Sequence, residues 1–196
     1  MSNKVVYLMR GLPSCGKSYT ARKLAGSTGV VLETDEYFLT QVGDDPTSYD
    51  YKKGMMSIAR KWNFDRFIKT VDEGVSPIVV DRGNSLSVES QIYARYATDR
   101  GYRLELREPE SEWWQEIRVL LKYKKHTKPV LYKWADRLAE WNKPIHRVSA
   151  KHIRKRIDRW KWDVTIQDIL NYRPSEKKPK SAPPPPPQGE DRAAST

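Results

Sequence analysis

The sequence predicts an α/β fold in which helices cover both faces of a parallel sheet, followed by a C-terminal helical region. Short apolar runs alternate with segments of helical pattern through the first half of the chain. This alternation is typical of parallel strands that are joined by helices. A glycine-rich loop follows the first apolar run, and two later runs end on an acidic residue.

The glycine-rich loop is the first element that carries chemistry. Residues 11–18 read GLPSCGKS and match the pattern G-x-x-x-x-G-K-S, between a predicted strand at Lys4–Met9 and a predicted helix at Ser18–Ala25. Its backbone N–H groups curl around a phosphate, and the helix N-terminus adds positive potential. The pattern therefore predicts a P-loop NTPase or kinase fold that binds ATP. The expected nucleotide contacts are Gly11, Leu12, Pro13, Ser14, Cys15, Gly16, Lys17, Ser18 and Tyr19.

Three further apolar runs complete the predicted sheet. The elements expected after the first helix are Val30–Asp35 (strand), Glu36–Asp50 (loop), Tyr51–Glu73 (helix), Pro77–Asp81 (strand), Ser87–Arg100 (helix) and Arg103–Leu106 (strand). Gly74 and Gly101 are expected to close the two helices. Ligands of such sheets bind at the C-terminal ends of the strands, where the P-loop, Asp35 and Asp81 all fall.

The second half of the chain is predicted to be helical and basic. Residues 112–170 have a helical pattern that we expect to break at Pro129 and Pro144. Residues 115–171 contain 15 basic and 6 acidic residues, whereas the chain up to residue 114 is neutral, with 16 of each. This basic block either binds a polyanion such as nucleic acid or forms a solvated face with ordinary lid arginines. The tryptophans interleaved with its charges are Trp134, Trp141, Trp160 and Trp162.

The chain is expected to form one domain and a tail. We predict a P-loop kinase domain over residues 1–171, in which residues 115–160 are a basic helical lid or insertion. Residues 172–196 contain five consecutive prolines and are expected to be disordered or polyproline-like. This tail is either passive or a ligand of a proline-binding protein module.

The single cysteine and the lack of an 18-residue apolar stretch predict an intracellular, cytoplasmic protein without a membrane partner, in a host cytoplasm if the source is viral. Cys15 lies near a helix N-terminus, a position that lowers the pKa of a thiol. It is therefore either a redox gate on nucleotide binding or a small residue that fits the loop, and we favour the second interpretation.

Acidic and basic residues around the loop are the candidates for catalysis. Asp35 follows the second strand and is expected to accept a proton from an attacking hydroxyl, with Glu33 and Glu36 as alternatives. Lys17 is expected to reach the β- and γ-phosphates, and Ser18 and Asp81 are expected to bind Mg²⁺. Charge on the transferred phosphoryl group also requires a lid arginine. The candidates for it are Arg147, Arg154 and Arg156.

Five stretches of the chain resemble a known family. They read MRGLPSCGKS, ETDEYF, KWNFDRF, SPIVVDRGNS and NKPIHRVSAKHIRKRIDRWKWDVTIQDIL. They are similar to P-loop kinases related to polynucleotide kinase, above all to the ATPase domain of ubiquitin-ligase-binding proteins that also carry an Smr module, and to its stand-alone relatives. The resemblance covers residues 1–170, apart from an insertion near residues 120–140. It implies an ATP-dependent kinase that phosphorylates a 5′-hydroxyl of DNA or RNA.

The resemblance also implies roles for individual residues. Lys17 and Ser18 would hold ATP and Mg²⁺, Asp35 would be the general base, and Arg147 would be the lid arginine. Asp81 and Asn84 would take the places of the Asp-x-x-Asn pair. Two departures from the family are Ser14-Cys15, where Gly-Ser is usual, and Arg82-Gly83 after the third strand. The residues expected to contact the acceptor or to support such contacts are Asn84, Arg82 and Arg66.

Two other functions remain open at this point. The same loop and base could serve a kinase whose acceptor is a nucleoside, a modified base, a metabolite or a protein. Alternatively, the chain could be a nucleotide-controlled module that binds nucleic acid or protein with little catalysis. A neutral small acceptor would make activity insensitive to salt, whereas nucleic-acid binding would weaken steeply with salt.

Overall fold

The computed structural model describes residues 3–40, 53–144 and 146–174. Within them, four parallel strands form one sheet in the order β2-β3-β1-β4. The strands are β1 (Val5–Met9), β2 (Val30–Glu33), β3 (Ile78–Asp81) and β4 (Arg103–Arg107). The predicted parallel α/β sheet is therefore confirmed. The second strand ends two residues earlier than expected, so that Glu33 lies opposite Asp81 in the register.

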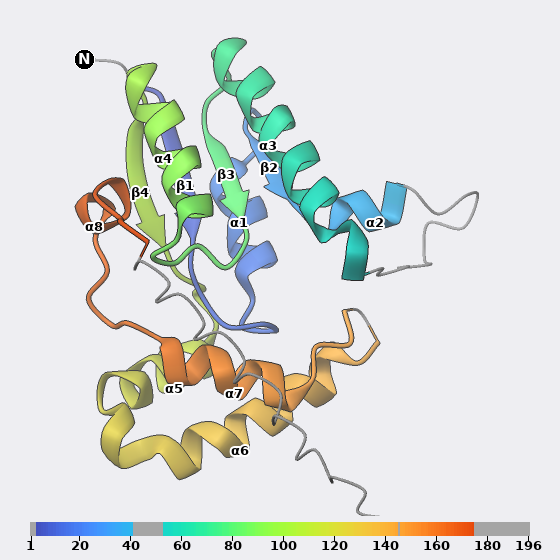
Figure 1. The fold of residues 1–196 in the computed structure, drawn as a ribbon, viewed down its shortest axis with the longest axis vertical. Helices are drawn as coiled ribbons and strands as arrows, with labels where there is room; N and C mark the ends of the chain where they lie inside the picture. Colours follow the sequence, from blue (N-terminus) through green and yellow to red (C-terminus); the bar gives the residue numbers. More distant parts are fainter. Residues whose placement is uncertain (1–2, 41–52, 145, 175–196) are drawn as a thin grey trace, which may run out of the picture.

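Eight α-helices belong to the described residues. They are α1 (Lys17–Ala25), α2 (Glu36–Thr40), α3 (Met56–Asp72), α4 (Val88–Asp99), α5 (Glu112–Lys122), α6 (Lys124–Asn142), α7 (Ala150–Arg159) and α8 (Ile166–Leu170). Figure 1 shows α5, α6 and α7 as a separate layer at the ends to which the strand arrows point. We call these three helices the helical layer. None of the helices described is long and apolar enough to cross a membrane.

Alternating strand residues build two cores on the two faces of the sheet. One face packs under α1, where Met9 and Val79 contact Ala21. The other face packs under α3, α4 and α8, and its fully buried side chains include Leu8 and Phe67. Parallel strands buried on both faces need continuous apolar sequence, which explains the apolar runs.

The helical layer has its own core, and the P-loop takes part in it. Trp114, Leu131 and Ile157 are buried there together with Leu12 and Cys15 of the loop. The loop therefore lies between the sheet and the helical layer, as Figure 1 shows for the dark blue segment between β1 and α1.

Helix boundaries follow local signals at most positions. Ser87 caps α4 by accepting a hydrogen bond from the backbone N–H of Ser90, and Gly74 (φ 74°) and Gly101 (φ 77°) close α3 and α4. Such left-handed residues after a helix favour glycine. The predicted helix ends at both glycines are therefore confirmed.

The expected break at Pro129 is wrong. Pro129 lies inside α6, and the turn between α5 and α6 comes at Tyr123, where the Thr127 hydroxyl donates 3.1 Å to the Tyr123 carbonyl. A proline within a helix removes one N–H and crowds the preceding turn. Burial of Leu131 and Leu138 in the core of the helical layer offsets that cost.

The expected loop at Glu36–Asp50 is also wrong at its start, because residues 36–40 form α2. Tyr37 and Phe38 of α2 are buried against Ala59 of α3, and this packing favours a helical turn over an extended loop. Residues 41–52, which include the predicted start of the next helix, lie outside the described residues, as do residues 175–196 of the predicted tail.

Candidate nucleotide-binding site

The P-loop connects β1 to α1 and has the backbone of a phosphate cradle. Gly11 (φ 152°) and Gly16 (φ 85°) adopt conformations that side chains disfavour, and a Cβ at Gly11 would lie 3.0 Å from Pro109. Gly16 caps α1 without a side chain, and the first N–H groups of a helix are those that bind anions. Lys17 donates 2.8 Å to the Leu12 carbonyl across the loop.

The helical layer holds the outer side of the P-loop through three hydrogen bonds. Trp113 Nε1 donates to the Ser14 carbonyl (3.0 Å), and the Ser111 hydroxyl donates to the Cys15 carbonyl (2.8 Å). The Asn142 amide donates to the Ser14 hydroxyl (3.1 Å). Ser14 itself has a positive φ of 58°, a conformation that favours the glycine usual at this position in the family, and its two contacts hold serine in that conformation.

Cys15 is fully buried, and its environment differs from that of a reactive thiol. Burial raises the pKa of the Cys15 thiol to about 12, although nearby Lys17 opposes the shift. The lowered pKa expected from the helix N-terminus is therefore wrong, because desolvation outweighs the positive potential. A small residue that fits the loop remains the better interpretation of Cys15.

A cavity of about 670 Å³ opens beside the loop. Most of the expected site residues line it, together with parts of α3, α5 and the segment from α6 to α7. The lining residues are Pro13, Ser14, Gly16, Lys17, Ser18, Tyr19, Arg22, Glu33, Thr34, Asp35, Met56, Arg60, Asp81, Arg82, Gly83, Trp113, Trp141, Asn142, His146, Val148 and Arg156.

Two carboxyl groups lie side by side at the ends of β2 and β3. Burial raises the pKa of Glu33 to about 8, and the negative charge of Asp81 adds to the shift. Asp81 Oδ2 is buried without a hydrogen-bond partner among the described residues. Hydroxyl and carboxylate oxygens suit Mg²⁺, so the residues present, Ser18 and Asp81, fit such an ion.

Lys17 lies near the Asp81 carboxylate from within the loop. Burial lowers the pKa of Lys17, and the charge of Asp81 opposes that shift. A buried ammonium group needs nearby negative charge, which here comes from Asp81 and which the phosphates of a nucleotide would increase.

The three acidic residues considered for proton transfer lie in different environments. The Asp35 side chain is 44% exposed and lines the cavity, with its Oδ2 3.8 Å from His146 Nδ1. The Glu36 carboxylate is paired with Arg66 at 2.5 Å and does not line the cavity. Glu33 is half-buried beside Asp81 and also lines the cavity, with a pKa raised to about 8. Of the two that line the cavity, Glu33 has a raised pKa that favours its protonated form, which leaves Asp35 as the better candidate for a general base.

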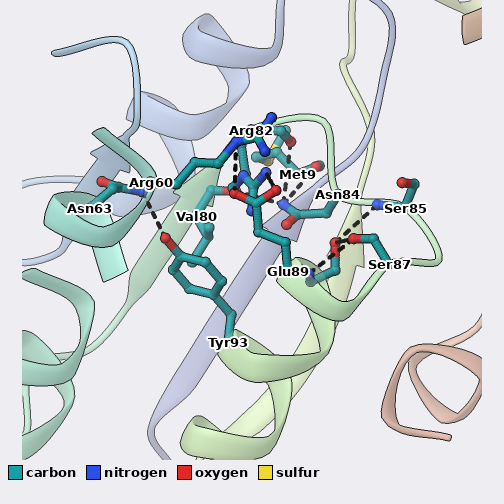
Figure 2. A network of polar contacts seen from close by, with 11 residues as sticks. Met9, Arg60, Asn63, Val80, Arg82, Asn84, Ser85, Ser87, Glu89 and Tyr93 are labelled. Atoms are coloured by element: carbon teal, nitrogen blue, oxygen red, sulfur yellow. Dashed lines mark hydrogen bonds and ion pairs between the residues drawn. The ribbon is translucent and has the colours of Figure 1, made fainter. Parts of the chain in front are cut away.

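Arg82 and Arg60 meet at Glu89 near the cavity wall, as Figure 2 shows. Arg82 Nη2 lies 2.5 Å from Glu89 Oε2, and Arg60 Nε lies 3.4 Å from Oε1 of the same carboxylate. Two guanidinium groups therefore share one anion. Nε and Nη1 of Arg82 are buried without hydrogen-bond partners among the described residues.

The three candidate lid arginines have different environments in the structure. Arg156 lines the cavity from α7, and its pKa is lowered by desolvation, an effect that Asp35 opposes. Arg154 is paired with Asp136 at 2.6 Å. Arg147 is exposed, has a positive φ of 51° and does not line the cavity. The resemblance pointed to Arg147, whereas the cavity contains Arg156.

Two further residues expected near the acceptor lie outside the cavity. Asn84 is 2% exposed and donates to the carbonyls of Met9 (2.9 Å) and Val80 (3.0 Å), which ties the ends of β1 and β3 together (Figure 2). Arg66 holds Glu36 and packs its guanidinium over Trp62. These contacts are structural.

Sequence reasoning missed the residues through which the helical layer reaches the site. Trp113, Asn142 and His146 line the cavity, and Glu89 organises two arginines behind its wall. None belongs to a phosphate-binding motif. His146 lies within the C-terminal stretch that resembles the family, which was the only signal for it.

Comparison with known proteins agrees with this geometry. Residues 6–118 match a protein family described as an AAA domain. The chain belongs to this family. Its AAA domain has a P-loop nucleotide-binding fold, and the expected relationship to P-loop kinase-like domains is confirmed. The family match ends within α5, so most of the helical layer lies beyond it.

Two human proteins illustrate the relationship. The chain is 29% identical to NEDD4-binding protein 2 over 175 residues, which are 88% of this chain and 8% of the relative. It is 32% identical to YLP motif-containing protein 1 over 97 residues, 39% of this chain and 4% of the relative. The chain thus spans less than a tenth of the length of either relative.

Proposed function

We propose that the chain is an ATP-dependent kinase that transfers the γ-phosphate to a hydroxyl group, and that its acceptor is the 5′-hydroxyl of DNA or RNA. One arrangement carries the proposal. The P-loop lysine, the Ser18–Asp81 pair and the exposed carboxylate of Asp35 all line one cavity. The Asp35 carboxylate in this cavity supports a hydroxyl acceptor, because a positioned carboxylate can take the proton of an attacking hydroxyl.

The nucleotide is bound by the loop. Its N–H groups and Lys17 hold the phosphates, and Tyr19 and Arg22 extend the site along α1. Ser18 and Asp81 are the residues that would hold Mg²⁺, which when bound neutralises charge on the β- and γ-phosphates.

Asp35 acts as the general base. The acceptor oxygen forms a bond to the γ-phosphorus while the bond from that phosphorus to the β–γ bridging oxygen breaks. The hydroxyl proton passes to the Asp35 carboxylate, and ADP leaves. His146, 3.8 Å from that carboxylate, orients it from the helical layer.

Arg156 stabilises the negative charge that develops on the transferred group. It lines the cavity near Asp35, and among the described residues no hydrogen bond or ion pair holds its guanidinium group. The helical layer would then act as the lid predicted for residues 115–160. The basic block of residues 115–171 supports a nucleic-acid acceptor, because positive charge attracts its phosphates.

The test is transfer of labelled γ-phosphate from MgATP to 5′-hydroxyl DNA and RNA oligonucleotides. Wild type should label them, Lys17→Ala and Asp35→Asn should not, and Glu36→Gln should label normally because Glu36 lies outside the cavity. ATP binding should persist in Asp35→Asn. Measurable ATP binding by wild type without labelling of any oligonucleotide would contradict the proposal, and small hydroxyl acceptors would be tested next.

A further inference from the structure

The four tryptophans of the basic block differ in how deeply they are buried. All seven tryptophans of the chain are described, and Trp141 alone is exposed, with 48% of its surface accessible. Trp134 is buried in the core of the helical layer. Trp160 and Trp162 are half-buried and pack against arginine guanidinium groups. Packing therefore accounts for three of the four, and Trp141 needs another explanation.

Trp141 lies in the last turn of α6 and lines the cavity beside the P-loop. Its ring makes T-shaped contacts with Trp113 (centroids 5.7 Å apart) and with Trp134 (6.2 Å). Trp113 is in turn fixed by its hydrogen bond to the Ser14 carbonyl. The exposed indole is thus held rigidly by two other indoles and connected to the loop that binds phosphate.

An exposed tryptophan beside a phosphate-binding loop suits a flat aromatic group attached to a phosphate. Nucleobases stack on indole rings, and a ring that is already fixed loses little conformational entropy on binding.

We infer that Trp141, supported by Trp113, is the stacking platform for an unpaired nucleobase. The inference rests on the proposed function in that the ligand is a nucleotide or the end of a nucleic acid, and it adds a base-binding subsite. The base belongs either to the nucleotide on the P-loop or to the 5′-terminal residue of the acceptor.

Two pairs of ligands test the inference by calorimetric titration of the full chain. The first pair is MgATP and magnesium tripolyphosphate, which differ by the nucleoside. The second pair is a 5′-hydroxyl oligonucleotide and the same oligonucleotide with an abasic 5′-terminal residue. The proteins are wild type, Trp141→Ala, Trp141→Phe and Tyr123→Ala, a control that removes an exposed aromatic ring outside the cavity.

Trp141→Ala should weaken binding of the base-carrying member of one pair about tenfold and leave its base-lacking partner unchanged. Trp141→Phe should weaken this binding less, and Tyr123→Ala should leave it unchanged. A selective loss for MgATP assigns the platform to the donor base, and a selective loss for the intact oligonucleotide assigns it to the acceptor base. Losses that do not depend on the base, or no loss, would overturn the inference.

These measurements do not depend on catalysis. Absence of phosphoryl transfer would contradict the proposed kinase while leaving the binding comparison interpretable. If Trp141→Ala unfolds, Trp141→Leu keeps the apolar bulk without an aromatic face, and the same comparison applies to it.

Discussion

The side-chain amide of Asn142 donates a 3.1 Å hydrogen bond to the hydroxyl of Ser14, which lies 128 residues earlier in the chain. The same amide group accepts a 2.8 Å hydrogen bond from the backbone N–H of Val148. One buried side chain thus joins the end of α6 and the segment before α7 to the P-loop. The shape of the loop therefore depends on the helical layer.

Asn142→Ala should lower the free energy of unfolding by about 1–3 kcal/mol, because it leaves buried polar groups without partners. It should also weaken ATP binding, since Ser14 loses a contact that holds its positive φ of 58°. Chemical denaturation and calorimetric titration measure the two effects. Asn171→Ala, at an exposed asparagine, is the control, and equal effects of the two substitutions would refute the role of Asn142.

Arg156→Ala should reduce kcat about 100-fold, as expected when a group that stabilises charge in the transition state is lost. Arg147→Ala should leave kcat close to wild type, because Arg147 does not line the cavity. Arg154→Ala removes a surface ion pair with Asp136, worth about 1 kcal/mol or less, and a guanidinium contact with the Tyr132 ring. Single-turnover kinetics on the three variants decide the matter, and a larger loss in Arg147→Ala than in Arg156→Ala would restore the assignment from the family resemblance.

Glu33 should make stability fall as the pH rises. Its pKa is raised from 4.5 to about 8 by burial and by Asp81, so between these values the folded protein binds a proton that the unfolded chain releases. The free energy of unfolding should therefore decrease from about pH 4.5 to about pH 8, and Glu33→Gln should flatten this slope. Denaturant titrations across that range, without Mg²⁺, provide the measurement, and an unchanged slope in Glu33→Gln would argue against the shift.

Asn84→Ala should lower the free energy of unfolding by about 1–3 kcal/mol, since two hydrogen bonds from its side chain to the buried carbonyls of Met9 and Val80 are lost, although each carbonyl keeps a backbone N–H donor. Asn84→Asp, whose side chain has no N–H groups, should be no more stable than Asn84→Ala. The acceptor KM of the folded variants should stay unchanged. A raised KM at full stability would instead support the contact with the acceptor that the resemblance implied.

Most of the fold could be predicted from the sequence because its signals are local. The four strands were expected within two residues of their observed ends, since only apolar runs can lie between two layers of helices. Gly74 and Gly101 predicted two helix ends. Pro129 was misleading, because a local propensity against helix is outweighed by the burial of Leu131 and Leu138 on the same helix.

The candidate site was predictable only in part. Lys17, Ser18, Asp35 and Asp81 line one cavity as expected, because they follow strands that end at the same edge of the sheet. No comparable rule predicts which residues of the helical layer line the cavity. Its arginines differ little in sequence context, and only their positions on α7 and in the segment before it show that Arg156 lines the cavity.

The amino-acid sequence alone predicts a P-loop between a buried strand and a helix, with acidic residues at the ends of two more strands. Backbone geometry and hydrophobic burial act over a few residues, so a motif suffices to predict them. The folded structure was needed to show that Asn142 and Trp113 hold the loop, that Asn84 joins two strands, and that Trp141 is the exposed tryptophan. These properties depend on contacts between distant segments, and burial of a side chain depends on everything packed around it.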